Sequence, residues 1–290
     1  MKKAPGALTL LLGVVVLAGM ARAETTALFD PDNLLAWCIV PYDSQHRTPA
    51  ERLAMLRRLG FTQYAWDWRQ AHLKDLPEEI RLAREAGVKL RAVWLWIDDK
   101  TDRPDKLSAA NRAVIDAVTQ AGLSVEYWVG FHANFFAGLD DAARVRKGAA
   151  MISALREKAL VTGSTVALYN HGDWFGEPDN QIKIIQAAGE RALGLVYNFH
   201  HAEGQTGRFG ELLPRMLPYL RAVNLNGLRP GAADSEIIPL GRGTLERTML
   251  HRLQQAGYAG PLGILGHTEG EDVEVVLRRN LEGFRKITSP

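Results

Sequence analysis

A stretch of 14 residues concentrates the side-chain types that chemistry requires. Residues 167–180 read ALYNHGDWFGEPDN, in which an apolar run gives way abruptly to Asn170 and His171, with Trp174 and Glu177 close behind. An imidazole beside a carboxylate can transfer protons or ligate a metal ion, and an indole can stack on a sugar ring. A polar loop without a function is the simpler interpretation, and the rest of the chain must decide between the two.

Similar groups recur along the chain, each at the end of a short apolar run. Six of the eight histidines occupy such positions, and only His72 and His251 do not. Most of the tryptophans lie in or just beyond the same runs. Because random placement would scatter these residues, we predict that residues 167–180 form one part of a ring of polar and aromatic groups around a ligand.

The elements that must position these groups alternate in a regular order. Amphipathic helical patterns separate the apolar runs, and residues 48–60 carry the complete signature of a helix, with Thr48 as N-cap, Pro49 at the first position and Gly60 at the stop. The runs begin 27 to 40 residues apart, and one βα unit needs about 30 residues. The strand-like runs cover residues 34–43, 61–68, 88–98, 124–131, 164–171, 194–201, 221–227 and 261–267.

Eight βα units in a chain of this length predict an α/β fold with one domain, the (β/α)8 TIM barrel. An open, doubly wound sheet is the alternative, but it usually has fewer strands and a glycine-rich phosphate loop after the first strand. Here the first strand leads into PYDSQHRTP (41–49), which contains no such loop. In a barrel the functional groups gather at the carboxyl ends of the strands, which is where the histidines lie.

The first 23 residues have the pattern of a cleavable secretory signal peptide. A positively charged start precedes an uncharged apolar stretch at residues 8–20, and Ala21-Arg22-Ala23 fits the small-residue cleavage site. The apolar stretch is too short for a comfortable membrane span. We therefore expect cleavage after Ala23, a periplasmic or secreted protein without a membrane anchor, and a single mature domain over residues 24–290.

Charge and cysteine content narrow the range of partners. Cleavage would remove Lys2, Lys3 and Arg22 and no acidic residue, so the net charge would fall from +2 to −1. A nearly neutral domain gives no indication of a nucleic-acid partner, and we expect none. The lone cysteine, Cys38, cannot form an internal disulfide, and its apolar surroundings predict a buried thiol. A small molecule is the expected partner, and no pattern in the sequence predicts the oligomeric state.

Several motifs resemble the xylose-isomerase-like TIM barrels, the sugar phosphate isomerase/epimerase family. PLGRG (239–243) matches the family's Pro-Leu-Gly-x-Gly loop, and GYAGP (257–261) matches the turn before its last strand. GLVYNFHH (194–201) resembles the strand that ends in Asp-x-x-His, and VNLNG (223–227) resembles the strand that follows. The resemblance implies the same barrel and a reaction that moves a proton on a sugar.

The resemblance also implies a metal site, which this chain does not reproduce. In the family two Glu, one Asp and one His on the last four strands generally hold a divalent metal that polarises a carbonyl group. Only the histidine after the sixth strand is matched, by His201. At the other positions this chain has Tyr169 followed by Asn170 and His171, then Asn198, Asn224, and Gly266 followed by His267.

Three interpretations of the site stay open. In the first, His171 and His201, with His267 or Glu177, hold one divalent transition metal such as Zn, Mn, Ni or Co. In the second, no metal takes part, and Glu177 or Glu126 exchanges protons with the sugar beside His171 or His201. In the third, the barrel binds a carbohydrate and catalyses nothing.

The enzyme interpretations predict an isomerase or epimerase for a neutral sugar or sugar derivative, and a lyase or hydratase for an oxidised sugar is a near alternative. Asp67 and Arg69 flank a tryptophan, where a structural ion pair is as plausible as a catalytic acid. Candidate sugar-binding groups are aromatic or hydrogen-bonding side chains at strand ends. They are Trp68, Trp96, His132, Asn170, Trp174, Asn198, Asn224, Asn226 and His267.

The neighbouring histidines His200 and His201 require a choice between them. Adjacent residues of a strand face opposite sides of the sheet, so only one of the two rings should point to the ligand. The resemblance to the family selects His201. We therefore expect His200 to pack outward.

Overall fold

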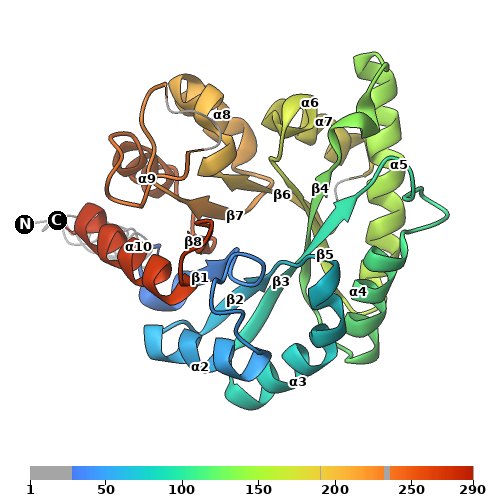
Figure 1. Cartoon of the computed structure of the whole chain (residues 1–290). Coiled ribbons are helices and arrows are strands. Elements are labelled where there is room, and N and C mark those ends of the chain that lie inside the picture. Colours follow the sequence, from blue (N-terminus) through green and yellow to red (C-terminus); the bar gives the residue numbers. More distant parts are fainter. Residues whose placement is uncertain (1–27, 190, 232–235, 290) are drawn as a thin grey trace, which may run out of the picture.

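The computed structural model describes residues 28–189, 191–231 and 236–289 and shows a closed ring of parallel strands (Figure 1). Each strand pairs with the next, and β8 closes the ring by pairing with β1. The predicted (β/α)8 TIM barrel is confirmed, and the open doubly wound sheet is excluded. The strands are β1 Leu34–Trp37, β2 Gln63–Trp66, β3 Lys89–Ile97, β4 Glu126–Phe131, β5 Thr165–Tyr169, β6 Leu193–Asn198, β7 Leu220–Leu225 and β8 Leu262–Leu265.

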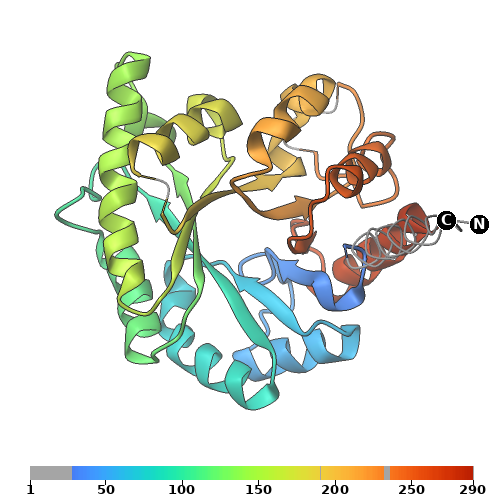
Figure 2. The same ribbon diagram turned by 180° about the vertical axis from the view of Figure 1, so that it is seen from behind.

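Helices surround the strands in both views of the chain (Figure 1, Figure 2). The α-helices are α2 Pro49–Leu59, α3 Leu76–Ala86, α4 Ala109–Gln120, α5 Asp141–Leu160, α6 Asp173–Gly176, α7 Pro178–Ala187, α8 Phe209–Met216, α9 Glu246–Gln255 and α10 Val273–Thr288. Short 3-10 helices are η1 Pro31–Asn33, η2 Gln70–Asp75, η3 Ala133–Phe136, η4 Phe199–His201 and η5 Glu203–Arg208. Four of these five, η2 to η5, lie on the segments that follow the carboxyl end of a strand.

Helix α2 shows how the local sequence sets the limits of an element. The Thr48 hydroxyl accepts a hydrogen bond from the Glu51 N–H (3.4 Å), and the Glu51 carboxylate accepts one from the Thr48 N–H (2.9 Å). This reciprocal capping box satisfies two free donors at the helix start. Gly60 ends the helix with a φ of 85°, which glycine adopts without strain. The predicted start and stop are both confirmed.

The interior of the barrel combines small and large side chains. Alanines from four strands share one buried cluster with aromatic rings, and their small volume leaves the rings room inside the closed sheet. The small buried residues are Ala65, Ala92, Ala167 and Ala222, and the large ones are Trp37, Trp128 and Tyr169. A larger apolar core lies between the strands and the surrounding helices.

β1 and β6 end three or more residues before the predicted apolar runs do, and both departures shape the site. β1 stops at Trp37, and Cys38 has a φ of 56°, in the left-handed region that few residues other than glycine adopt. β6 stops at Asn198, whose side-chain oxygen accepts a hydrogen bond from the His200 N–H (3.1 Å) and so caps η4. Residues after these points no longer alternate between the two faces of a sheet.

The predicted signal peptide, residues 1–23, lies outside the described residues, so cleavage after Ala23 stays a prediction. In the three described ranges, no helix has the length and apolar character needed to cross a membrane.

Candidate active site

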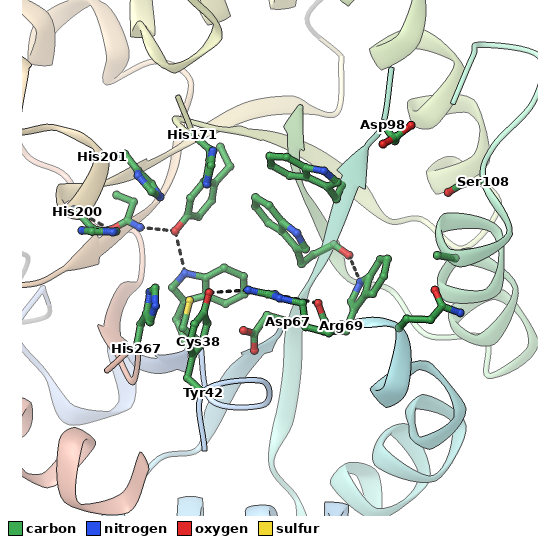
Figure 3. A pocket seen from close by; sticks show the side chains of 18 of the residues that line it. Cys38, Tyr42, Asp67, Arg69, Asp98, Ser108, His171, His200, His201 and His267 are labelled. Atoms are coloured by element: carbon green, nitrogen blue, oxygen red, sulfur yellow. Dashed lines mark hydrogen bonds between the residues drawn. The ribbon is translucent and has the colours of Figure 1, made fainter. Parts of the chain in front are cut away.

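A cavity of about 860 Å³ opens where the strands of the barrel end (Figure 3). Its wall combines residues from β1, β3, β5, β6 and β8 with residues of the segments that follow these strands and β2. The lining is mainly apolar, and a few polar groups converge on it, as is typical of sites for small molecules. The carboxyl end of the strands is also the end at which TIM-barrel enzymes place their active sites.

The floor of the cavity is organised around the hydroxyl group of Tyr169. The Trp37 indole N–H donates a hydrogen bond to this oxygen (2.8 Å), and the Asn198 side-chain amide donates a second. The Trp94 ring packs edge-on against the Tyr169 ring, with 5.0 Å between the centroids. Burial raises the pKa of Tyr169 well above its usual value. The phenol is therefore neutral, and its proton is available for donation to a ligand.

Four histidines line one side of the cavity, and they come from the segments that follow β5, β6 and β8. The ring centroids of His171 and His201 lie 4.4 Å apart, those of His200 and His201 lie 4.6 Å apart, and those of His200 and His267 lie 5.9 Å apart. Burial, followed by repulsion from the other histidines, lowers the pKa of His201 to about 2. Burial lowers the pKa of His267 to about 4 and also lowers that of His171. These three imidazoles are therefore neutral at pH 7.

The expectation that His200 packs outward is wrong. His200 and His201 both line the cavity. The physical reason is the early end of β6, because both residues belong to the 3-10 helix η4 and not to a strand. The His200 ring nitrogen Nδ1 also lies 3.8 Å from a carboxylate oxygen of Glu203, the first residue of η5.

A buried carboxyl group, Asp67, faces the cavity directly after β2. Its side chain is 3% exposed, and its Oδ1 accepts hydrogen bonds from the backbone N–H groups of Ile39 (3.2 Å) and Val40 (3.3 Å). Its Oδ2 has no hydrogen-bond partner among the described residues. Burial raises the pKa of Asp67 to about 6, against the opposing effects of the Val40 N–H, of the Arg69 charge and of the N–H of Asp67 itself. Asp67 can therefore exchange a proton close to neutral pH.

Arg69 and Tyr42 complete the rim beside this carboxyl group. The Arg69 guanidinium donates a hydrogen bond to the Tyr42 hydroxyl (2.6 Å), and the Tyr42 ring stacks on His267 with 3.6 Å between centroids. This contact joins the segments after β1, β2 and β8. Cys38 lines the cavity nearby, and burial raises its pKa, so the predicted buried thiol is confirmed and stays protonated.

The two glutamates predicted to be catalytic are not brought to the cavity. Glu126 is the first residue of β4, at the opposite end of the barrel, where its carboxylate accepts a hydrogen bond from the Trp128 indole (2.9 Å). Glu177 lies between α6 and α7, where it forms an ion pair with Arg208. Asp67, which is buried, lines the cavity directly after β2. The other carboxyl groups of the lining, Asp98 and Asp102, belong to the loop after β3.

The predicted sugar-binding residues divide into two groups. Trp68, Trp96, Asn198 and His267 line the cavity, as do both histidines predicted to bind a metal, His171 and His201. The others make contacts elsewhere in the described structure. The Trp174 indole N–H donates a hydrogen bond to the Asp141 carboxylate (3.1 Å), and the His132 side chain caps η3. The Asn170 side chain exchanges two hydrogen bonds with the backbone of Asn198, and the Asn226 side chain donates one to the Gly227 carbonyl. Asn224 is fully buried beside Tyr169.

The donor groups in the described residues do not fit a preformed metal site. No group of three His, Cys, Asp or Glu side chains is placed so that it could hold one ion. His171 and His201 form a close pair, but a structural or catalytic site for zinc needs at least three protein ligands. We therefore derive no chemical step through a metal.

Comparison with known proteins establishes the fold. A 3-keto-D-glucoside 4-epimerase from E. coli superimposes with a TM-score of 0.66 at 14% identity, over 88% of this chain and 99% of that one. A D-psicose 3-epimerase crystallised with D-fructose gives 0.63 at 14% identity, over 88% and 98%. A xylose isomerase-like TIM barrel protein from Mycobacterium smegmatis, in complex with magnesium, gives 0.59 at 16% identity, over 88% and 95%.

No protein-family model matches the sequence, and no curated protein matches it. At 14 to 16% identity, the likeness to these structures shows a shared fold. The chain thus has the xylose-isomerase-like (β/α)8 barrel, and the resemblance inferred from the C-terminal motifs is confirmed at the level of architecture.

Proposed function

We propose that this protein is a sugar isomerase or epimerase in which Asp67 transfers the proton. One observation carries the proposal. A buried carboxyl group with an unpaired oxygen and a pKa of about 6 lines an aromatic cavity at the catalytic end of the barrel. A base is most effective when its pKa lies near the working pH. The structural neighbours that are epimerases for a 3-keto-glucoside and for psicose support the same class of reaction.

In this mechanism the ionised Asp67 removes a proton from the carbon next to a sugar carbonyl. The electron pair of the broken C–H bond forms a C=C bond, and the carbonyl electron pair moves to the oxygen to give an enediolate. Return of the proton by Asp67 to the former carbonyl carbon gives the isomer. Epimerisation needs a second proton donor, a neutral acid or a water molecule on the other side of the ring, which delivers a proton to the opposite face of the original carbon and is reprotonated from solvent while Asp67 releases its own proton. The atoms of substrate and product are the same, so no oxidant or reductant is required.

Three neutral donors and one cationic donor would stabilise the oxygen that gains charge. The neutral imidazoles of His201 and His267 and the neutral phenol of Tyr169 can each donate a hydrogen bond in the cavity. Arg69 adds a positive charge at the rim. Donors that the fold holds in place stabilise a developing charge without first having to reorient.

A neutral sugar is the substrate class that suits these walls. The indoles of Trp68 and Trp96 are half-buried and line the cavity, and an aromatic face packs well against the C–H face of a sugar ring. Amide and imidazole groups such as Asn198 and His171 can bind several hydroxyl groups. The carbonyl-bearing sugar in the neighbouring structure with D-fructose has the chemistry that this mechanism requires.

Solvent isotope exchange tests the proposal. The protein is incubated in D2O with a panel of ketoses and 3-keto-glycosides, and deuterium on carbon is followed by NMR. We expect incorporation with at least one sugar and a loss of about 100-fold or more in Asp67→Asn, the range for removal of a general base. The rate of the wild-type protein should fall as the pH drops through about 6, where Asp67 becomes protonated.

Glu177→Gln is the matched control. The sequence also suggested Glu177 as a proton-transfer group, but its carboxylate forms an ion pair with Arg208 outside the cavity. This variant should retain exchange. Equal loss in the two variants, or full exchange in Asp67→Asn, would remove Asp67 from the mechanism. Binding of sugars without any exchange would favour the non-catalytic carbohydrate-binding barrel, and an unsaturated product detected by its ultraviolet absorbance would favour the lyase alternative.

A metal-dependent version of the reaction has its own test. One neighbour is a complex with magnesium, and His171 and His201 are close enough to share an ion once a further ligand comes from substrate or water. Elemental analysis of the untagged protein, after incubation with Zn, Mn, Ni or Co, is compared with that of a His171→Ala/His201→Ala double variant. About one metal per chain that disappears in the double variant would support this version.

A further inference from the structure

We infer that the cavity binds two sugar units, so that the ligand is a disaccharide or another glycoside. The inference rests on the proposed function for its inner part, where the reacting ring would lie against Asp67, His171, His201 and Tyr169. It adds an outer subsite, which we define by Trp68, Trp96, Asp98, Lys100, Ser108 and Ala110.

The size of the cavity is the first argument. Its volume of about 860 Å³ lies near the upper end of the range of about 300–1,000 Å³ for sites that hold drug-sized ligands. A single hexose ring is much smaller than a drug-sized ligand. One ring against Asp67 would therefore leave a large part of the apolar wall in contact with water.

The lining groups also separate in space. In Figure 3 the labelled histidines His200, His201 and His267 lie on one side of the pocket, Asp98 and Ser108 lie on the other, and Asp67 lies between them. The histidines come from the segments after β6 and β8, whereas Asp98 and Ser108 bracket the loop between β3 and α4. A ligand that contacts both groups must extend across the mouth of the barrel.

Two tryptophans form the wall between these regions. The Trp68 indole N–H donates a hydrogen bond to the Trp94 carbonyl (2.8 Å), which fixes the ring at the rim. The Trp96 ring stacks on Trp94 at 5.9 Å and meets His171 edge-on at 5.1 Å. Gly130 on β4 makes this possible, because a Cβ there would lie 2.5 Å from the Trp94 ring. Trp96 thus links the inner and outer parts of the cavity with a fixed aromatic surface.

The loop from Asp98 to Ser108 is held in place before any ligand arrives. Asp102 is 2% exposed and accepts hydrogen bonds from the N–H groups of Asp98 (3.0 Å) and Ser108 (2.8 Å) and from the Asn111 side chain (3.1 Å). The Asp98 carboxylate accepts from the Lys100 N–H (2.8 Å). Because the loop is preorganised, its polar side chains can bind the hydroxyl groups of a second ring at a low entropic cost.

Calorimetric binding to matched sugars tests the inference without any turnover. D-glucose is compared with cellobiose and maltose, and D-galactose with lactose. We expect at least one disaccharide to bind about tenfold more tightly than its monosaccharide. In Ala110→Trp a bulky ring fills the outer subsite, so this preference should disappear while monosaccharide affinity stays within about twofold. Ala113→Trp on the exposed part of the same helix is the control and should keep the preference.

Equal affinity for the two members of every pair would overturn the inference, as would no binding of any disaccharide. A parallel loss of both affinities in Ala110→Trp would do the same. This test and the test of Asp67 can fail separately. If the protein prefers disaccharides but never exchanges deuterium, the outer subsite is supported and only the proposed reaction is rejected.

Discussion

Burial acts in opposite directions on the acidic and the basic side chains of the cavity. It raises the pKa of Asp67 to about 6 and lowers the pKa of His201 to about 2. In both cases the charged form loses its hydration, so the neutral form is favoured. Near neutral pH the inner cavity thus combines a carboxyl group close to its titration point with imidazoles that are neutral donors and acceptors. This pairing suits proton transfer better than ion binding.

The buried histidines predict how stability depends on pH. In the unfolded chain the ring of His201 binds a proton below about pH 6.5, whereas in the folded protein it does not until about pH 2. The free energy of unfolding should therefore fall as the pH decreases from 6.5, by up to about 1.4 kcal/mol per pH unit for this ring. His201→Gln should remove up to about 2 kcal/mol of the loss between pH 6.5 and 5. Urea unfolding at several pH values measures this slope.

His251→Gln on α9 is the control, because His251 lies outside the cavity, and the slope of this variant should match that of the wild-type protein. The same slope in His201→Gln as in the wild-type protein would contradict the pKa shift of the ring.

The residue types of the site were only partly predictable from the sequence. The histidines could be found because they stand at strand ends. Asp67 also stands at a strand end, but neither its burial nor its free oxygen can be read from a sequence, so a structural ion pair was equally plausible. Glu177 and Glu126 were misplaced for the same reason, since one is paired with Arg208 and the other begins a strand. Nothing in the sequence indicated that Tyr42 belongs to the site, because its place there depends on its hydrogen bond with Arg69 and its ring contact with His267.

At the scale of elements, the PLGRG motif that carried the family resemblance has a structural role. The Asn280 side chain on α10 accepts a hydrogen bond from the Leu240 N–H (2.9 Å) and donates one to the Leu265 carbonyl of β8 (2.7 Å). Gly283, one turn further along α10, lies against the Leu240 carbonyl, and a Cβ at that position would be 1.7 Å from the oxygen. The motif therefore fixes the last helix against the barrel and supplies none of the cavity residues.

Gly283→Ala should destabilise the protein by about 2–3 kcal/mol, because helix α10 would have to move away from the Leu240 backbone. Gly207→Ala, where a Cβ would have no neighbour within 4 Å, should change stability by less than about 0.5 kcal/mol. Chemical denaturation of the two variants measures the difference. A loss in Gly283→Ala no larger than that in Gly207→Ala would show that the contact is not tight.

The helix limits could be predicted from caps and glycines, which act locally. The ends of β1 and β6 could not be predicted, because apolar residues continue beyond both strands, whereas the chain turns at Cys38 and enters η4 at Phe199. The orientation of the His200 ring was predicted wrongly because the residue was assigned to a strand and lies in η4.

At the scale of the whole molecule, the regular spacing of strands and helices was enough to predict the barrel, since eight βα units in one domain leave few other arrangements. Export depends on residues outside the described ranges, and we propose that the chain is exported and that the mature protein begins at Glu24.

Expression of the full chain in a bacterial host, followed by fractionation and intact-mass measurement, tests this proposal. We expect the periplasmic or secreted protein to have the mass of residues 24–290, because Ala21-Arg22-Ala23 fits the small-residue pattern that signal peptidases cleave. Ala23→Phe should block cleavage and leave the longer chain in the membrane fraction. A soluble, uncleaved wild-type chain in the cytoplasm would contradict the proposal.

The position of Asp67 after β2 also bears on descent. Each strand of a closed ring ends in its own loop, so a substitution at one strand end leaves the backbone pairing of the other strands unchanged. A carboxyl group can therefore arise at the end of β2 without any change in the backbone pairing of the other strands. In such a barrel the backbone can stay the same while the reactive group changes from one strand end to another.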